Sequence, residues 1–231
     1  MIYNFPKNIV IGLGGSVICP KNIDIRFLKN FKKTIEFWVK EGRKFIIVTG
    51  GGRLSREYQE AAEKIFSIDD INKDRIGIQA TRLNAQLIRS IFGKNADLTV
   101  VSGRDITKKK LHYPITVASG WIPGRSTDFV AAQMAVDFKI KEIIAMGKPD
   151  YVYNKDNQVY KDAQPFFEMK WKDYRKLLPK DWKPGAHAPV DTVAAQFAQR
   201  RRLKMIIIGK SLKNLNNLLK GTNFKGTIVS N

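Results

Sequence analysis

Residues 45–54 read Phe-Ile-Ile-Val-Thr-Gly-Gly-Gly-Arg-Leu, an apolar, β-branched run that ends in three consecutive glycines. Apolar side chains then recur at helical spacing, at Leu54, Tyr58, Ala61 and Ile65. The segment thus predicts a strand, a glycine turn and an amphipathic helix. Because glycine lacks a Cβ atom, the backbone N–H groups of such a turn can approach an anion closely. The stretch favours a phosphate-binding loop, although a tight turn that needs flexibility would use the same residues.

The same alternation of β-branched runs and helical patterns extends through the chain. Further strands are expected at Ile9 to Leu13, Leu98 to Val101, Ile115 to Ala118, Glu142 to Met146 and Met205 to Ile208, besides Phe45 to Thr49. Helical stripes lie between them, for example from Ile25 to Trp38 and from Val130 to Phe138. This order predicts an α/β protein with a mostly parallel sheet.

Composition narrows the class of partner. The chain has 231 residues, 43% of them hydrophobic, and its net charge of +20 comes from 41 Lys and Arg against 21 Asp and Glu. Such an excess attracts polyanions, which leaves nucleic acid and small phosphorylated molecules as alternatives. No zinc-finger spacing, RNP signature or basic zipper occurs. We therefore expect phosphorylated small molecules rather than nucleic acid.

Targeting signals are missing from the sequence. Its one cysteine, Cys19, cannot form an intramolecular disulfide, which suits a reducing compartment. No apolar run reaches the roughly 18 residues that a membrane helix needs, and the first residues lack the order of a signal peptide. We expect a cytoplasmic protein with no membrane partner.

A second glycine loop lacks both of the common nucleotide-binding motifs. The run Gly12-Leu13-Gly14-Gly15-Ser16 follows the first expected strand. It matches neither the Walker pattern nor the dinucleotide fingerprint, whose third glycine would fall on Val17. Phosphate binding here must therefore use another architecture, or the glycines serve only as turns.

Two other loops follow strands and carry functional groups. In residues 118–128, Arg125 supplies a cation, Ser126 and Thr127 supply hydroxyls, and Asp128 stands at a helix start, as either an N-cap or a functional carboxylate. In residues 147–156, aromatic and acidic side chains beside a lysine suit an adenosine pocket or an ordinary surface turn.

In order along the chain, seven segments carry a family likeness: residues 13–17, 50–58, 76–85, 123–128, 150–153, 190–195 and 208–210. Together they resemble the amino acid kinase family, and within it the archaeal-type UMP kinases, over nearly the whole chain. The segment Thr81-Arg82-Leu83-Asn84-Ala85 favours this branch over the acetylglutamate, aspartate and carbamate kinases.

The resemblance implies a three-layer α/β/α sandwich in a single domain, with an acceptor-side lobe at about residues 1–140 and an ATP-side lobe at about 141–231. It assigns ATP contacts to Gly14, Gly15, Gly52, Arg56, Tyr153 and Asp156. It assigns UMP contacts to Gly51, Asp74, Trp121, Ile122, Pro123, Gly124, Arg125, Ser126 and Thr127, with Asp74 just before a helix that starts near Ile76. Mg²⁺ would accompany ATP, and a homo-oligomer is expected, with a hexamer as one candidate.

The implied reaction is transfer of the γ-phosphoryl group of ATP to UMP in pyrimidine nucleotide biosynthesis. Candidate catalytic groups are Arg56, Arg125, Asp128, Lys148 and Asp191, with no protein metal site. Lys148 is included because many relatives place a lysine where this chain has Gly12; a solvated loop lysine is the alternative. Two other functions stay open: a kinase of another small phosphate acceptor such as isopentenyl phosphate, and a non-catalytic nucleotide-binding regulator.

Overall fold

The structure is a computed structural model that describes residues 5–106, 111–179 and 188–231. Within these residues a seven-stranded sheet has the order β3-β2-β1-β4-β8-β9-β7. Its strands are β1 (Asn8–Leu13), β2 (Lys44–Thr49), β3 (Ile115–Ala118), β4 (Glu142–Met146), β7 (Glu168–Lys170), β8 (Lys204–Ile208) and β9 (Thr227–Ser230). All neighbours run parallel except β8 and β9. A separate antiparallel pair joins β5 (Val152–Tyr153) to β6 (Pro165–Phe166).

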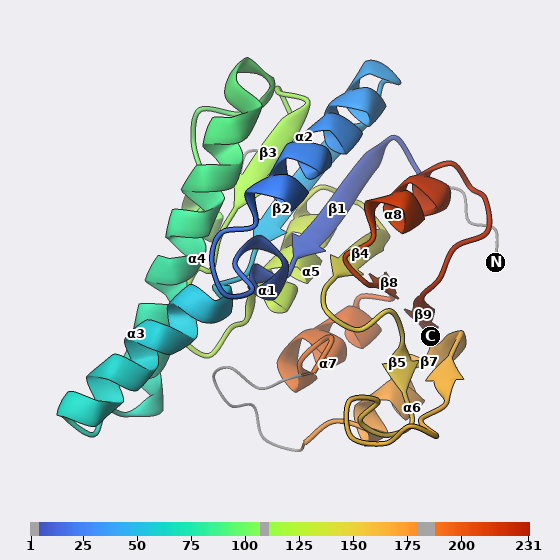
Figure 1. Cartoon of the computed structure of the whole chain (residues 1–231). Helices are drawn as coiled ribbons and strands as arrows, with labels where there is room; N and C mark the ends of the chain where they lie inside the picture. The colour runs from blue at the N-terminus through green and yellow to red at the C-terminus, as the bar shows by residue number, and fades with distance from the viewer. Residues whose placement is uncertain (1–4, 107–110, 180–187) are drawn as a thin grey trace.

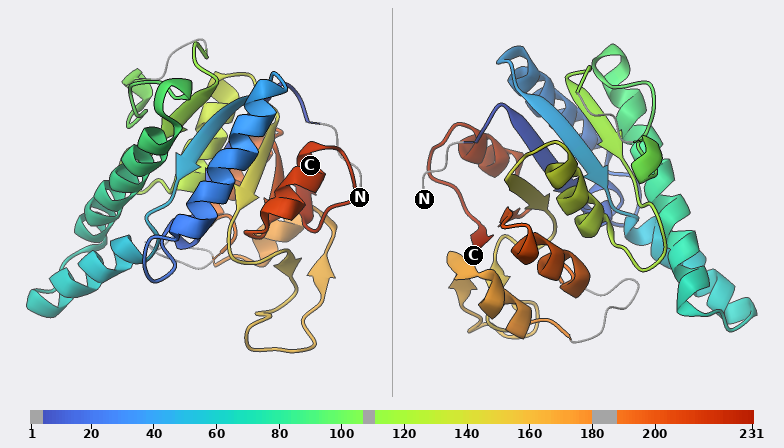
Figure 2. Two further views of the ribbon diagram at one scale, coloured as in Figure 1. Left: turned by 45° about the horizontal axis from the view of Figure 1, so that its top comes forward. Right: turned by 180° about the vertical axis from the view of Figure 1, so that it is seen from behind.

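Helices cover both faces of the sheet, as the two views of Figure 2 show. One face carries α2 (Ile25–Lys40), α4 (Asp70–Phe92) and α8 (Leu212–Leu219), and the other carries α5 (Thr127–Asp137), α6 (Trp171–Lys176) and α7 (Thr192–Arg200). Side chains alternate between two cores, so that Ile9 and Ile11 of β1 join the first and Val10 joins the second. The expected three-layer α/β/α sandwich is confirmed.

Shorter elements complete the chain. Helices α1 (Gly15–Ile18) and α3 (Gly52–Ile65) follow β1 and β2 directly, and two 3₁₀ turns span Gly93–Asn95 and Arg104–Ile106. The arrowheads of β1 and β2 point toward α1 and α3 (Figure 1), which places the glycine loops at one edge of the sheet. No helix in the described ranges combines the length and apolar character that a membrane crossing requires.

The strand expected at Leu98 to Val101 is wrong. Only isolated bridges form here, between Ala96 and Ile115 and between Val101 and Ala118. The Asp97 carboxylate accepts a hydrogen bond from the Thr99 N–H at 3.1 Å, and this local turn competes with a regular ladder. The other expected strands are confirmed, and β1, β2 and β8 each begin one residue earlier than expected.

The helix expected to start near Ile76 begins earlier, at Asp70, where the Asp69 carboxylate caps it by accepting from the Asn72 N–H at 2.7 Å. Asp74 therefore lies inside α4 rather than before it. Its side chain projects from the second turn of a long helix, which gives the carboxylate a rigid base.

Candidate functional site

Five parallel strands, β1 to β4 and β8, bring their carboxyl ends to the same edge of the sheet. The loop after each strand is tied to its neighbour: Gly14 N–H donates to the Met146 carbonyl at 2.8 Å, and Gly50 N–H donates to the Leu13 carbonyl at 2.9 Å. In an open α/β sheet this edge is where ligands collect. The loops singled out from the sequence thus meet at one place.

The two glycine loops pack backbone against backbone. A Cβ atom on Gly15 would lie 2.5 Å from the carbonyl carbon of Gly51 and 2.6 Å from that of Gly50, which no side chain can accommodate. Gly52 has φ +66°, in the left-handed region that favours glycine. The glycines are therefore required by the close approach of the two loops at this edge of the sheet.

Two arginines follow the second glycine loop, on α3, and differ in what they contact. The Arg53 guanidinium pairs with Glu57 at 2.5 Å on the same helix face. Arg56 is half-buried and makes no hydrogen bond or ion pair within the described residues. Of the two cations, Arg56 is the one available to an incoming anion.

The acceptor-side loop, residues 119–126, joins β3 to α5. Ser126 caps α5 by accepting from the Phe129 N–H at 3.1 Å, and Gly124 turns the chain with φ +78°. The Gly124 N–H donates to Asp74 Oδ2 at 2.6 Å, although the two residues are 50 positions apart. Burial raises the pKa of Asp74, and the Gly124 bond opposes that effect. Asp74 therefore lies against the loop, as its expected role requires.

Side chains of this loop differ in exposure. Arg125 is exposed, with its guanidinium 4.9 Å from the ring centroid of Phe129, a cation–π contact. Ile122 and Pro123 are also exposed, whereas Trp121 is buried and donates its indole N–H to the Val101 carbonyl at 3.3 Å. Trp121 is thus a packing residue whose side chain is engaged in the core.

Two carboxylates form an acidic centre behind the loop. Asp191 is the N-cap of α7 and accepts from the Val193 N–H at 2.8 Å and the Ala194 N–H at 3.1 Å. The Ser126 hydroxyl also donates to Asp191. Asp128 is the second residue of α5, so its expected alternative as an N-cap is wrong: Ser126 holds that position.

The surroundings of Asp128 and Asp191 disfavour a negative charge on both carboxylates at once. Burial raises the pKa of Asp128 to about 8, the neighbouring Asp191 charge adds to the rise, and a backbone hydrogen bond of Asp191 opposes it. Burial also raises the pKa of Tyr174, whose hydroxyl donates to the Val190 carbonyl at 2.7 Å. The centre therefore attracts either a proton or a cation.

The fourth loop lies after β4 and runs into β5. Lys148 is exposed and makes no ion pair within the ranges that the structure describes. Tyr153 is half-buried in β5, with its ring 6.1 Å from that of Tyr151 in an edge-to-face contact. Asp156 is exposed, and its carboxylate accepts from the Gln158 N–H at 2.8 Å in a turn. The contacts of Tyr153 and Asp156 with ATP therefore stay predictions.

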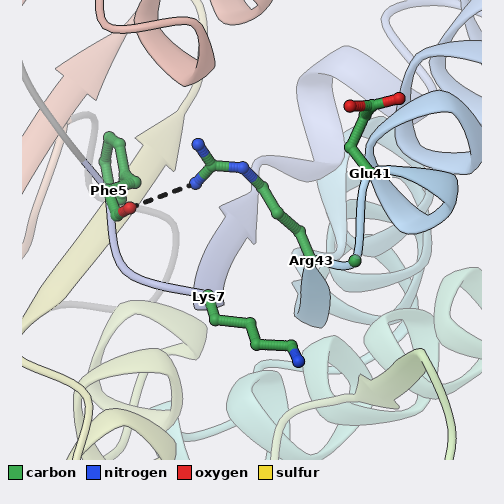
Figure 3. A pocket seen from close by; sticks show the side chains of 5 residues that line it. Phe5, Lys7, Glu41 and Arg43 are labelled. Atoms are coloured by element: carbon green, nitrogen blue, oxygen red, sulfur yellow. Dashed lines mark hydrogen bonds between the residues drawn. The ribbon is translucent and has the colours of Figure 1, made fainter.

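A hollow lies at the opposite edge of the sheet (Figure 3), lined by Phe5, Lys7, Glu41, Gly42 and Arg43. Of its two cationic side chains, Arg43 is engaged in packing: it donates to the carbonyls of Phe5 at 3.3 Å and Leu219 at 2.9 Å. Burial lowers the pKa of Arg43. We assign this hollow to packing of the chain's first described residues and place the candidate site at the carboxyl edge.

Three residues that the structure places at the site had no individual role predicted from the sequence. Tyr174 packs near the acidic centre, and the buried side chains of Thr81 and Asn84 reach the acceptor-side loop and the second glycine loop. Only the family likeness of residues 76–85 signalled the last two. Within the described residues no group of three His, Cys, Asp or Glu side chains could hold a metal ion.

Known proteins resemble the chain over almost its full length. The sequence pattern of the Amino acid kinase family matches residues 7–209. Uridylate kinases of Thermococcus sibiricus and Methanocaldococcus jannaschii are both 33% identical, over 96% of this chain and 98% of theirs. The crystal structure of uridylate kinase from Archaeoglobus fulgidus superposes with a TM-score of 0.80 at 29% identity, covering 97% of this chain and 100% of that one. UMP kinase from Bacillus anthracis shares the fold, with a TM-score of 0.76 at 18% identity.

Proposed function

The chain belongs to the amino acid kinase family, and we propose on this premise that it is a uridylate kinase of the archaeal type. It transfers the γ-phosphoryl group of ATP to UMP, giving ADP and UDP. The observation that carries this function is the meeting of the two glycine loops and the acceptor-side loop at one sheet edge, beside Arg56. There, donor and acceptor phosphates can be held in line.

ATP would bind on the side of the glycine loops. Gly14, Gly15 and Gly52 would present backbone amides to its phosphates, and Arg56 would face them because no carboxylate engages it within the described chain. Tyr153 and Asp156 would lie toward the adenosine. This assigns ATP to a lobe at about residues 141–231 together with the glycine loops, and the acceptor to a lobe at about 1–140.

UMP would bind between α4 and the acceptor-side loop. One carboxylate oxygen of Asp74 accepts the hydrogen bond from the Gly124 N–H, and the other oxygen would accept one from a ribose hydroxyl. Arg125, Ser126 and Thr127 would face the phosphate. Gly51 and residues 121–124 would form the rest of the pocket, with Trp121 contributing through its backbone since its ring is buried.

Phosphoryl transfer asks the protein for positioning and positive charge rather than covalent chemistry. Arg56 and Arg125 supply permanent charges on the donor and acceptor sides. Lys148 would add a third, replacing the lysine that Gly12 does not provide. No general base is needed, because an oxygen of the UMP phosphate is already ionised at neutral pH.

Mg²⁺ fits the acidic centre on grounds of charge. Asp128 and Asp191 repel one another, and hard oxygen ligands of this kind suit Mg²⁺. A metal ion bound with ATP would neutralise phosphate charge in the reaction. The residues that would orient it are Asp128 and Asp191, acting from behind the acceptor-side loop.

A homo-oligomer would cover the projecting end of α3 and α4 (Figure 1). No residue of α3 is buried, and four large side chains at this end are exposed: Tyr58 by 65%, Ile65 by 86%, Phe66 by 75% and Ile71 by 55%. An apolar cluster of this kind is typical of an interface. A second copy of the chain is the partner we propose, and light scattering would measure the assembly.

An acceptor screen tests the function directly. Purified protein with ATP and Mg²⁺ should release ADP when UMP is added, and much less when isopentenyl phosphate or another monophosphate replaces it. ADP release with another acceptor alone would assign a different kinase activity. No release with any acceptor, together with salt-sensitive binding to duplex DNA, would support a non-catalytic regulator instead.

A further inference from the structure

Helix α4 contacts the second glycine loop through one buried amide. The Asn84 side chain is 4% exposed and donates to the Gly50 carbonyl at 2.8 Å and to the Gly51 carbonyl at 3.1 Å. A single NH₂ group thus satisfies two consecutive peptide carbonyls, using both of its protons. These two peptides are the ones that turn the loop beside Gly15.

This arrangement fixes where two amides of the loop point. In a planar trans peptide the C=O and the N–H of the next residue point in opposite directions. With the carbonyls of Gly50 and Gly51 turned toward Asn84, the N–H groups of Gly51 and Gly52 are turned away from α4. Neither N–H has a partner within the described residues, so both are free to face phosphate oxygens.

One turn earlier, Thr81 makes the corresponding contact with the acceptor-side loop. Its hydroxyl accepts from the Gly120 N–H at 2.8 Å and donates to the Ile78 carbonyl at 2.6 Å. Its own carbonyl accepts from the Thr49 hydroxyl at 3.0 Å, at the end of β2. Thr81 is 7% exposed, so these bonds are protected from water.

We propose that Thr81 and Asn84 are positioning residues that set the separation of the donor and acceptor phosphates. Three residues apart, they lie on one face of a rigid helix, so the glycine loop and the acceptor-side loop are held by a common support. This inference rests on the proposed kinase function. A displacement of about 1 Å between reacting groups costs on the order of 100-fold in rate, so even a small shift of one loop relative to the other should slow the reaction.

The two residues should fail in different ways. Asn84→Ala removes the bonds that hold the carbonyls of Gly50 and Gly51. The N–H groups of this loop can then change direction at the place where ATP and UMP meet. We expect kcat to fall at least tenfold, with smaller changes in both KM values. Thr81→Val keeps the shape but loses the bond to Gly120, so the KM for UMP should rise about fivefold or more while that for ATP stays within twofold. Thr81→Ser restores the hydroxyl and should recover most of the loss.

A matched control separates positioning from folding. Asn214 on α8 is also buried; it donates to the Lys225 carbonyl at 2.6 Å and accepts from the Lys225 N–H at 2.7 Å, in a part of the fold that carries no proposed site residue. Asn214→Ala should lower the melting temperature much as Asn84→Ala does, yet keep kcat and both KM values within twofold. If Asn84→Ala does not fold, Asn84→Ser, which leaves a polar group in place, replaces it.

Amide exchange supplies a readout that needs no activity. The Gly50 and Arg53 amides, which donate to the carbonyls of Leu13 and Cys19, should exchange faster in the Asn84 variant. Exchange over residues 119–124 should accelerate in Thr81→Val, each variant leaving the other loop unchanged. If the parent protein releases no ADP with UMP, the proposed function fails. Amide exchange would still test whether Thr81 and Asn84 hold the two loops in place. Unchanged exchange in both loops, or kcat and KM values that match those of the Asn214 control, would overturn the proposal.

Discussion

Replacing Gly15 by alanine tests the packing of the two glycine loops. The new Cβ would lie 2.1 Å from the backbone nitrogen of Gly52, its nearest neighbour, whereas ordinary van der Waals contact begins at 3.4 Å, so the loops must separate by about 1.3 Å. Overpacking of this kind costs about 1–3 kcal/mol. For a chain of this size it should lower the melting temperature by about 2–12 °C.

Activity should suffer more than stability does. A shift of about 1 Å or more between donor and acceptor phosphates costs about 100-fold in kcat, which corresponds to about 2.7 kcal/mol of barrier. UMP-dependent ADP release at saturating substrates measures this loss, and thermal melts measure the loss of stability. Gly12→Ala is the control for folding, because its Cβ would meet nothing closer than 3.8 Å. A Gly15→Ala protein with kcat within twofold of the parent would refute the close approach.

Four substitutions test the remaining assignments. Asp74→Asn should raise the KM for UMP at least about tenfold, or about 1.4 kcal/mol, because a ribose acceptor is weakened; an unchanged KM would contradict that role. Arg125→Lys keeps the charge but loses the two-pronged donor, so kcat/KM for UMP should fall about tenfold, and full retention would place Arg125 on the solvated surface. Lys148→Ala should lower kcat about tenfold at constant melting temperature; a change below twofold would remove Lys148 from the catalytic set. The folded-state pKa of Asp128 lies above its ordinary value, so ligand-free stability should fall as pH rises toward about 8, and Asp128→Asn should flatten that slope in melts between about pH 6 and 9. An equal slope in both proteins would contradict the raised pKa.

Much of the central sheet could be predicted from local pattern. The strands from Ile115 to Ala118 and from Glu142 to Met146 were predicted at both bounds, because they are mostly apolar runs that end at turn residues. The last two strands of the sheet were not predicted. Thr227–Ser230 buries its first three residues but is short and ends in serine, and Glu168–Lys170 is short and largely exposed, so neither forms an apolar run that stands out in the sequence.

The loops of the site could be predicted, but the contacts between them could not. Glycine runs after strands indicate where backbone must bend, and they do so within a few residues. The bond from Gly124 to Asp74 spans 50 positions, and nothing local distinguishes Asp74 from any other helical aspartate. Likewise, the choice of Ser126 over Asp128 as the cap of α5 depends on where the chain enters the helix, which the tertiary structure decides.

The place of β9 between β8 and β7 has a consequence for the order in which the protein is made. Strands β1 to β4 can pair once residue 146 has been synthesised, whereas Glu168 of β7 must wait sixty residues for its partner Ile228. Until then β8 presents an open edge, a site where unfinished chains can associate wrongly. We infer that assembly proceeds from the acceptor side and closes last at β9. A chain released at residue 226 should leave the amides of Glu168–Lys170 open to exchange, and protection there would show that β7 finds its place without β9.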